Sequence, residues 1–338
     1  MGITDADLYN ANGNGLAGIN DIPDATRIVL AILFFCIAVV GLAANSAIIH
    51  TFRKSSTLQT PSNVLIVGCV MCDITMILIG YPFVIASHFH GNWLFGAAWC
   101  QGYGFVVTLL GVSSICILTA VAIDRYFVIT ESPFAKKITT FKAAMTILSC
   151  LGYGLLWATF PLVGWGRFVV EPGGMSCGPD WANHASSPQS YAIAILVLVL
   201  LLPVTIIVFC YLRIFVTVQK KSGQGDEFAA RTRSTEVNVA FSSFLIITSF
   251  LVAWAPYGVM SVWVMLNDVN QLPQSVAMFA PLLAKSASTW NPLVYVGRSK
   301  QFRQAFVKII FRRICTNRVN VTSVSVEPTQ GPSSSSGV

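Results

Sequence analysis

Seven long apolar stretches divide the chain, and each is long enough to cross a lipid bilayer as a helix. A spanning helix needs about 20 predominantly apolar residues. The stretches cover 26–52, 61–86, 99–130, 142–164, 188–218, 237–266 and 274–297. Spanning β-strands would instead show short segments of alternating polarity, which the sequence lacks. We therefore expect an all-α membrane protein in which a seven-transmembrane helix bundle occupies 26–297.

The distribution of charge supports this assignment and gives it a direction. Only 10% of the 338 residues are charged, against about 25% in soluble domains. All of the 21 lysines and arginines except Arg27, Arg167 and Lys285 fall at helix ends or loops of one face. The positive-inside rule then places the N-terminus outside and the C-terminus in the cytosol. The net charge of +7 is read as this bias toward the inner leaflet and not as a nucleic-acid footprint.

The two ends of the chain differ from the bundle. Residues 1–25 are rich in Asn and Gly and are expected to be extracellular and disordered. The segment 298–315 is basic and amphipathic, so an eighth helix is expected along the cytosolic membrane face. Cys315 at its end is a candidate for palmitoylation, with a plain free thiol as the alternative. Residues 316–338 are rich in Ser, Thr and Pro, and are expected to be a disordered cytosolic tail open to phosphorylation.

A single lysine, Lys285, lies near the middle of the seventh stretch. An ammonium group is expensive inside a membrane, so an intramembrane lysine is a functional candidate. In dry surroundings its amine loses the proton readily and can condense with an aldehyde. The alternative is a structural lysine that reaches an interface, but Lys285 lies several helical turns from either end of its span.

Two outer cysteines and two outer histidines have separate interpretations. Cys100 opens the third span and Cys177 lies in the second outer loop, and both face an oxidising compartment, so a disulfide between them is expected. His88 and His90 are placed in the first outer loop, as exposed polar residues rather than metal ligands. The sequence shows no plausible metal cluster and no Gly-rich phosphate loop, so no enzyme motif offers an alternative interpretation of the chain.

The cytosolic half of the bundle carries polar residues that could form a switch. Asp124-Arg125-Tyr126 ends the third span, and Glu236 at the start of the sixth is the distant partner expected for Arg125. A contact that can break would make a bistable element, while the alternative is an ordinary interfacial ion pair. Deeper polar residues should face the bundle and bond one another, as a sodium or water site or as a structural polar cluster; they are Asn45, Asp73 and Asn291.

These residues together resemble the fingerprint of the rhodopsin-class G-protein-coupled receptors over about 26–315. The ordered set is Asn45, Asp73, Cys100, Asp124-Arg125-Tyr126, Pro203, Trp254-x-Pro256 and Asn291-Pro292-x-x-Tyr295. Lys285, six residues before Asn291, narrows the resemblance to animal opsins, in which that lysine binds retinal as a Schiff base. Several strings look most like the peropsin group: Ile79-Gly80-Tyr81-Pro82, Val252 to Tyr257 and Ala280 to Ser286.

The resemblance implies partners and a location. A heterotrimeric G protein would bind at the cytosolic face, and arrestin and a receptor kinase would act on the tail. The protein would lie among membrane lipid in the plasma membrane of photoreceptor or accessory cells. Ser299-Lys300-Gln301 departs from the usual start of the eighth helix, which leaves the choice of G protein open.

The resemblance also implies a retinal pocket that needs an anion. A protonated Schiff base is a buried cation and requires a buried counterion. Tyr103 occupies the position where vertebrate visual opsins carry a glutamate, so it can only hydrogen-bond in the Schiff-base region. Glu171, six residues before Cys177, is favoured, and Asp180, Asp268 and the N-terminal carboxylates stay open. The remaining pocket walls, carried over by position, are Thr108, Gly111, Trp181, Ile195, Phe250, Trp254, Tyr257 and Ala284.

Two functions follow from this resemblance. In the first, light isomerises retinal and switches the bundle for G-protein signalling. In the second, the protein is a peropsin-like photoisomerase that converts all-trans-retinal to 11-cis-retinal with little or no signalling, and the enzyme assignment therefore stays open. A third reading is an ordinary small-ligand receptor with a chance lysine.

Overall fold

The computed structural model describes residues 22–133, 138–221, 227–298, 303–304 and 307, and these fold into seven helical rods. The predicted eighth helix, Cys315 and the tail lie almost wholly outside these residues. In chain order the rods are α2 (Asp24–Lys54); α3, η3 and α4 (Pro61–Thr75, Met76–Gly80, Tyr81–His90); α5 (Gly96–Ile129); α6 and η5 (Thr140–Thr159, Phe160–Val163); α7, η6 and α8 (Ser186–Ile195, Leu196–Leu201, Leu202–Lys221); α9 (Glu227–Leu266); and α10 (Gln274–Arg298). Two short helical turns, η2 (Ser56–Leu58) and η7 (Val269–Gln271), lie in connections.

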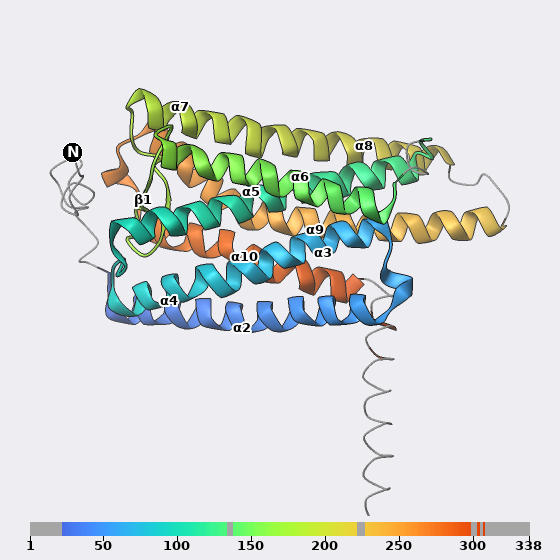
Figure 1. Ribbon diagram of the computed structural model, residues 1–338, viewed down its shortest axis with the longest axis horizontal. Coiled ribbons are helices and arrows are strands. Elements are labelled where there is room, and N and C mark those ends of the chain that lie inside the picture. Colours follow the sequence, from blue (N-terminus) through green and yellow to red (C-terminus); the bar gives the residue numbers. More distant parts are fainter. Residues whose placement is uncertain (1–21, 134–137, 222–226, 299–302, 305–306, 308–338) are drawn as a thin grey trace, which may run out of the picture.

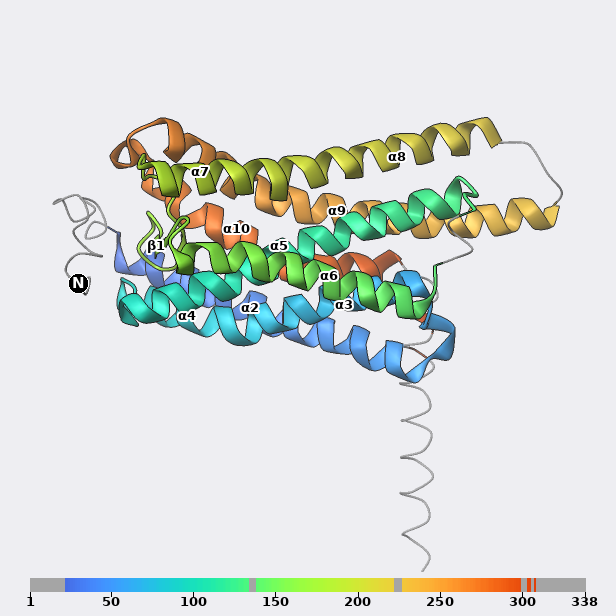
Figure 2. The ribbon, with the colours of Figure 1, turned by 45° about the horizontal axis from the view of Figure 1, so that its top comes forward.

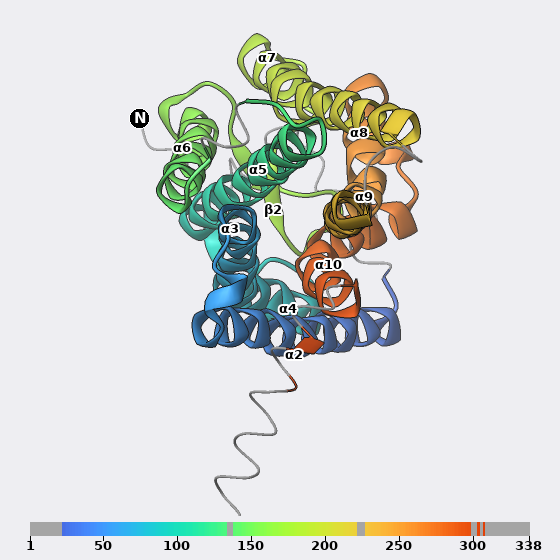
Figure 3. The same cartoon turned by 90° about the vertical axis from the view of Figure 1, so that its right-hand side faces the viewer.

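The rods run side by side as one bundle, which confirms the predicted fold class (Figure 1). Viewed from the end, α5 lies among α3, α6 and α8, and α10 lies between α2 and α9 (Figure 3). At one end α8 and α9 extend past the other rods (Figure 2). The buried core is therefore shared by all seven rods and centres on the inner faces of α5 and α10.

The last rod, α10, differs in composition from the other six. By length and apolar composition, the other six rods are able to span a membrane, as far as the described residues show. Helix α10 carries a set of buried polar side chains from its middle onward, Lys285, Ser286, Ser288, Thr289 and Asn291. It packs inside the bundle against α2 and α9, so its polar groups face protein and not lipid.

Two rods contain a short π-helical segment next to a proline. In the second rod η3 precedes Pro82, and in the fifth rod η6 precedes Pro203. A π-helical turn inserts one extra residue, and it often marks a functional position. Each insertion rotates the part of the rod on one side of it relative to the part on the other side. The hydrophobic pattern alone did not predict these insertions.

The second rod also continues further than expected, and this corrects the placement of His88. Helix α4 ends at His90, where Gly91 adopts a left-handed conformation with φ of 100°. His88 is therefore a buried helical residue whose Nδ1 lies 2.8 Å from the carbonyl oxygen of Val84. His90 is exposed, as predicted.

A two-stranded hairpin closes the end of the bundle at which α5 and α10 begin, and this end is called the outer end below. Strands β1 (Phe168–Val170) and β2 (Cys177–Pro179) are antiparallel, with Val170 paired to Cys177. A disulfide joins Cys177 to Cys100 in α5. The amide of Gln101 also donates to the carbonyl oxygen of Phe168, at 2.7 Å. The hairpin is thus attached to the outer end of α5 by both of its strands.

Gly104 allows the close approach of this hairpin, so its replacement by alanine should displace the hairpin. A Cβ atom at Gly104 would lie 2.5 Å from Cγ of Phe168, a ring that is fully buried. Overpacking of this kind typically costs about 1–3 kcal/mol. We expect Gly104→Ala to lower the thermal unfolding midpoint of the purified protein. Gly102→Ala is the matched control on the same helix, because a Cβ there meets no atom within 4 Å; equal midpoints for the two variants would contradict the prediction.

Candidate functional site

A cavity of about 170 Å³ lies inside the outer half of the bundle, beneath the hairpin. Its walls come from the second, third, fifth, sixth and seventh rods and from the hairpin, and they are mostly apolar. Lys285 lines the cavity from α10, and Glu171 lines it from the loop that follows β1. Apolar cavities with few polar groups are the usual form of small-molecule sites.

The side chain of Lys285 is buried, with 7% of its area exposed, and its partner is Glu171. Its Nζ lies 3.9 Å from Oε2 of Glu171, whose side chain is 4% exposed. Two opposite charges in a dry site stabilise each other, and the separation of either one from the pair is costly. The structure therefore brings together the two residues that the sequence singled out for the amine and the anion.

The backbone at Lys285 is held by a residue whose role the sequence did not reveal. The hydroxyl of Tyr81, in α4, donates to the carbonyl oxygen of Lys285 at 2.5 Å and lies 2.8 Å from Oγ of Ser288. Tyr81 is 1% exposed. This hydrogen bond fixes the backbone of α10 at Lys285, the position from which the amine enters the cavity.

Glu171 is oriented by two further hydrogen bonds. The hydroxyl of Tyr257 donates to Oε1 at 2.5 Å, and the hydroxyl of Ser176 donates to Oε2. The indole Nε1 of Trp181 donates in turn to the Tyr257 hydroxyl, at 3.1 Å. The carboxylate thus has a hydrogen bond to each oxygen and keeps Oε2 directed toward Lys285.

The hairpin explains why Glu171 reaches the cavity. The Glu171 amide donates to the carbonyl oxygen of Ser176 at 2.8 Å, which extends the ladder one step beyond the Val170–Cys177 pair. Because the disulfide attaches Cys177 to α5, the carboxylate six residues earlier is carried over the cavity. A solvated loop residue would not be buried in this way.

The other carboxylates that the sequence left open have different partners or positions. Asp180 is buried and pairs with Arg167, whose Nε lies 2.6 Å from Oδ2. Asp268 caps η7 through the amide of Asn270, in an exposed connection. Asp24 pairs with Arg27. The carboxylates before residue 22 lie outside the described residues.

The cavity walls agree with the expected set except for Tyr103. Thr108, Gly111, Trp181, Ile195, Phe250, Trp254, Tyr257 and Ala284 all line the cavity. Tyr103 does not, because its ring packs edge-on against Phe83 and Trp93 on the side of α4. Its buried hydroxyl has no hydrogen-bond partner within the described residues, so it remains an available donor near the site.

The far end of the cavity reaches the deep polar residues. Asp73 lines the cavity and accepts a hydrogen bond from Nδ2 of Asn291 at 3.3 Å. Asn45 belongs to a neighbouring contact, since its amide donates to the carbonyl oxygens of Gly41 and Ser288 at 2.8 and 2.9 Å. The second, seventh and first rods are thus joined by polar contacts, with Asp73 at the level of Asn291.

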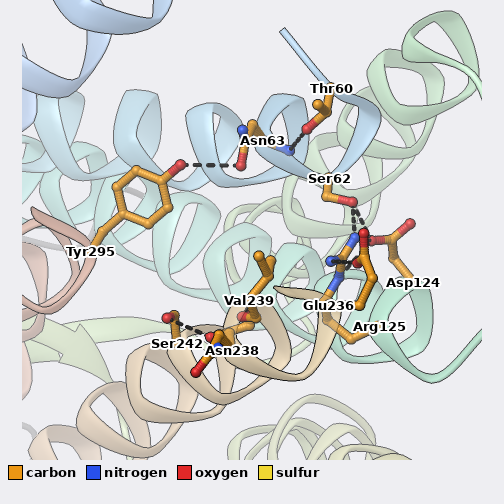
Figure 4. Close-up of polar contacts among 11 residues, drawn as sticks. Thr60, Ser62, Asn63, Asp124, Arg125, Glu236, Asn238, Val239, Ser242 and Tyr295 are labelled. Atoms are coloured by element: carbon orange, nitrogen blue, oxygen red, sulfur yellow. Dashed lines mark hydrogen bonds and ion pairs between the residues drawn. The ribbon is translucent and has the colours of Figure 1, made fainter. Parts of the chain in front are cut away.

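At the opposite end of the bundle, Arg125 is the centre of a polar cluster (Figure 4). Its guanidinium contacts Oδ2 of Asp124 at 2.5 Å and Oε2 of Glu236 at 3.4 Å. Ser62 of α3, which the sequence did not suggest, accepts from Arg125 and donates to Asp124 at 2.6 Å. The cluster therefore connects α3, α5 and α9.

Tyr126 and Tyr295 lie beside this cluster in different contacts. Tyr295 donates to Oδ1 of Asn63 at 3.1 Å, as Figure 4 shows. Tyr126 packs near Phe209 of α8, with ring centroids 6.0 Å apart. Neither Asn63 nor Ser62 has a distinctive sequence signal apart from its place after Thr60-Pro61 at the start of α3.

Comparison with known proteins gives a consistent result along the whole bundle. Residues 44–295 match the family model described as 7 transmembrane receptor (rhodopsin family). The human visual pigment-like receptor peropsin is 31% identical over 94% of this chain and 93% of its own length. The G0-coupled rhodopsin of Mizuhopecten yessoensis is 31% identical over 89% of this chain and 76% of its own length.

The solved structures show the same likeness in three dimensions. The crystal structure of squid rhodopsin superposes with a TM-score of 0.79 and 29% sequence identity, covering 85% of this chain and 86% of that one. The fold, the family match and the similar proteins all indicate the same family as the residues gathered around Lys285 and Arg125. The chain is an integral membrane protein that belongs to the rhodopsin family of seven-transmembrane receptors and, within it, to the opsins.

Proposed function

We propose that this opsin senses light through retinal bound as a Schiff base on Lys285, with Glu171 as its counterion. The observation that carries the proposal is the buried pair itself: Nζ of Lys285 lies 3.9 Å from Oε2 of Glu171 at the wall of an apolar cavity. Regeneration of the purified protein with retinal tests it, because a covalent pigment should form with a visible absorption band.

The residues present suit this cofactor. The apolar walls match a polyene, and among the described residues that line the cavity Lys285 supplies the amine that can join an aldehyde carbon with loss of water. When bound, retinal supplies the absorption of light and a double bond whose geometry light can change. Glu171 would balance the positive charge, while Tyr257 and Ser176 hold its two oxygens.

Trp254 gives the cavity a connection to α9. Its ring lines the cavity, and in the sequence it precedes Pro256 by two residues. The ring packs against Gly111 of α5, where an added Cβ atom would be in van der Waals contact with it. Proline removes a backbone hydrogen bond and weakens the helix locally. Displacement of this ring would therefore tilt α9 at its weakest point and strain the Arg125–Glu236 contact at the other end.

The family implies coupling to a G protein, and we place this coupling at the Arg125 end. The contact between Arg125 and Glu236 joins α5 to α9, and a separation of these helices would open the end of the bundle. With the positive-inside rule, this end is cytosolic and the hairpin is extracellular. Arrestin and a receptor kinase would act on the tail, and Cys315 would be lipidated; these segments lie outside the described residues.

Loss of the Glu236 charge should raise activity in the dark. Glu236 is 41% exposed and its contact with Arg125 is 3.4 Å long, so the pair contributes only about 0–1 kcal/mol. We expect Glu236→Gln to increase dark nucleotide exchange on a purified G protein by up to about fivefold. Asp268→Asn, in the connection after α9, is the control; dark exchange that is unchanged in Glu236→Gln would argue against a restraining contact.

A photoisomerase is the second candidate, and it rests on the peropsin-like strings Ile79-Gly80-Tyr81-Pro82, Val252 to Tyr257 and Ala280 to Ser286. In this case release of the isomerised retinal would be the main outcome, and signalling would be secondary. Light-dependent nucleotide exchange and chromatography of the retinal isomers should be measured on the same sample. Exchange with retained retinal supports the receptor, and released 11-cis-retinal without exchange supports the isomerase.

A further inference from the structure

A second hollow lies on the outside of the bundle, between the first two rods. It is a groove of about 650 Å³ formed by one face of α2 and by two residues of α3. The residues that line it are Ser46, Ile49, His50, Arg53, Lys54, Met71 and Ile74. None of them contributes to the cavity around Lys285, so the groove is separate from the proposed retinal site.

One end of this groove is basic. Arg53 and Lys54 form the last turn of α2, and both are exposed. His50 lies one turn earlier on the same face. No carboxylate lines the groove, and within the described residues none of these three side chains has a hydrogen bond or an ion pair. The groove therefore offers cationic donors without a partner from the protein.

The inner end of the groove is suited to hydrocarbon. Ile49, Met71 and Ile74 supply apolar side chains, and Met71 is 50% exposed on the lipid side of the bundle. From Lys54 to Ser46 the groove follows α2 for about 12 Å at the usual helical rise. It thus runs from the level of lipid headgroups into the acyl layer, with charge at one end and apolar contacts at the other.

We propose that this groove binds an anionic phospholipid, with the headgroup at Arg53, Lys54 and His50 and an acyl chain along Met71 and Ile74. The charge favours an anionic headgroup, and the apolar side chains of the groove offer contacts for an acyl chain attached to it. The groove lies at the same end of the bundle as Arg125, since α3 begins there and its Ser62 contacts Arg125. The lipid therefore comes from the cytosolic leaflet in the orientation proposed above.

Native mass spectrometry of the purified full-length protein, titrated with phosphatidylserine or phosphatidylcholine, tests this site. A basic residue near an anionic headgroup contributes roughly a fivefold change in affinity. We expect phosphatidylserine to bind at least about tenfold more tightly than phosphatidylcholine, and Arg53→Gln/Lys54→Gln to remove this preference. The matched control is Lys142→Gln/Arg213→Gln, which removes two exposed cations outside the groove and should keep the preference.

A second pair of variants tests the apolar half of the site. Met71→Trp should fill the groove and weaken phosphatidylserine binding, whereas Leu148→Trp, at an exposed position of α6, should not. Helical circular dichroism and a monodisperse elution profile verify that each variant folds. Neither these checks nor the lipid titration requires bound retinal, so the test is independent of the proposed retinal site. Equal losses in the groove and control variants would show a general attraction to the basic face and overturn the proposal. Equally tight binding of glycerophosphoserine, which lacks acyl chains, would also overturn it.

Discussion

Replacement of Lys285 by alanine is expected to abolish the visible absorption band completely. The amine at this position is the only buried lysine among the described residues, and it lines the cavity beside Glu171. Without it there is no nucleophile to join the aldehyde of retinal. Mass spectrometry after incubation with retinal and reduction with borohydride should find the label on Lys285 in the native protein and no label in Lys285→Ala.

The control for this experiment is a lysine outside the bundle core. Lys142 is exposed in the first turn of α6, so Lys142→Ala should form pigment like the native protein. Thermal unfolding of Lys285→Ala without retinal shows whether the variant folds. A label on another side chain, or an undiminished band in Lys285→Ala, would leave a seven-helix receptor of unknown agonist in place of the light sensor.

Neutralisation of Glu171 should move the absorption from the visible to the near ultraviolet at neutral pH. A buried anion favours the protonated form of its cationic partner, so its loss favours the unprotonated form. The sign of the pH dependence follows from this: protonation of the Glu171→Gln pigment should require lower pH, and acidification should restore the visible band. Absorption spectra taken through a pH titration measure both effects.

Asp180 provides a matched comparison for Glu171. It follows β2 of the same hairpin and is also buried, but its carboxylate pairs with Arg167 at 2.6 Å and not with Lys285. Asp180→Asn should therefore weaken the loop while the visible band stays at its wavelength. If Glu171→Gln kept its visible band at neutral pH, another group would have to serve as the counterion.

The sequence predicted most of the bundle because the membrane imposes simple requirements on it. Each span needs a long apolar stretch, so six of the rods were found with boundaries within a few residues of those observed, α2 beginning at Asp24 against the expected 26. Helix α9 begins at Glu227, ten residues before the expected 237, because its first turns are rich in charged and polar residues. The extension of α4 to His90 was missed, because helix geometry continues until Gly91 ends it with a positive φ. The π-helical segments η3 and η6 were missed for a related reason: a single inserted residue leaves the apolar pattern almost unchanged.

The site was predictable where a residue type is rare in its surroundings. A lysine in mid-membrane and a glutamate before a bridged cysteine stand out from the sequence, and the structure places them 3.9 Å apart. Tyr81, Ser176 and Ser62 do not stand out, because hydroxyl groups are common and their partners are more than 60 positions away for Tyr81 and Ser62. Tyr103 does not line the cavity, because its ring packs in an aromatic cluster with Phe83 and Trp93, and its expected hydrogen bond in the Schiff-base region stays a prediction.

The length of α9 has a mechanical consequence. The helix continues from Leu266 back to Glu227, and Pro256 interrupts its hydrogen bonding near the outer end. Glu227 and Pro256 are 29 positions apart, which gives an arm of about 44 Å at the usual rise per residue. A tilt of about 10° at the proline would then sweep the inner tip through about 8 Å. A side-chain displacement of ordinary size at Trp254 would in this way be amplified to a distance comparable with the diameter of a helix.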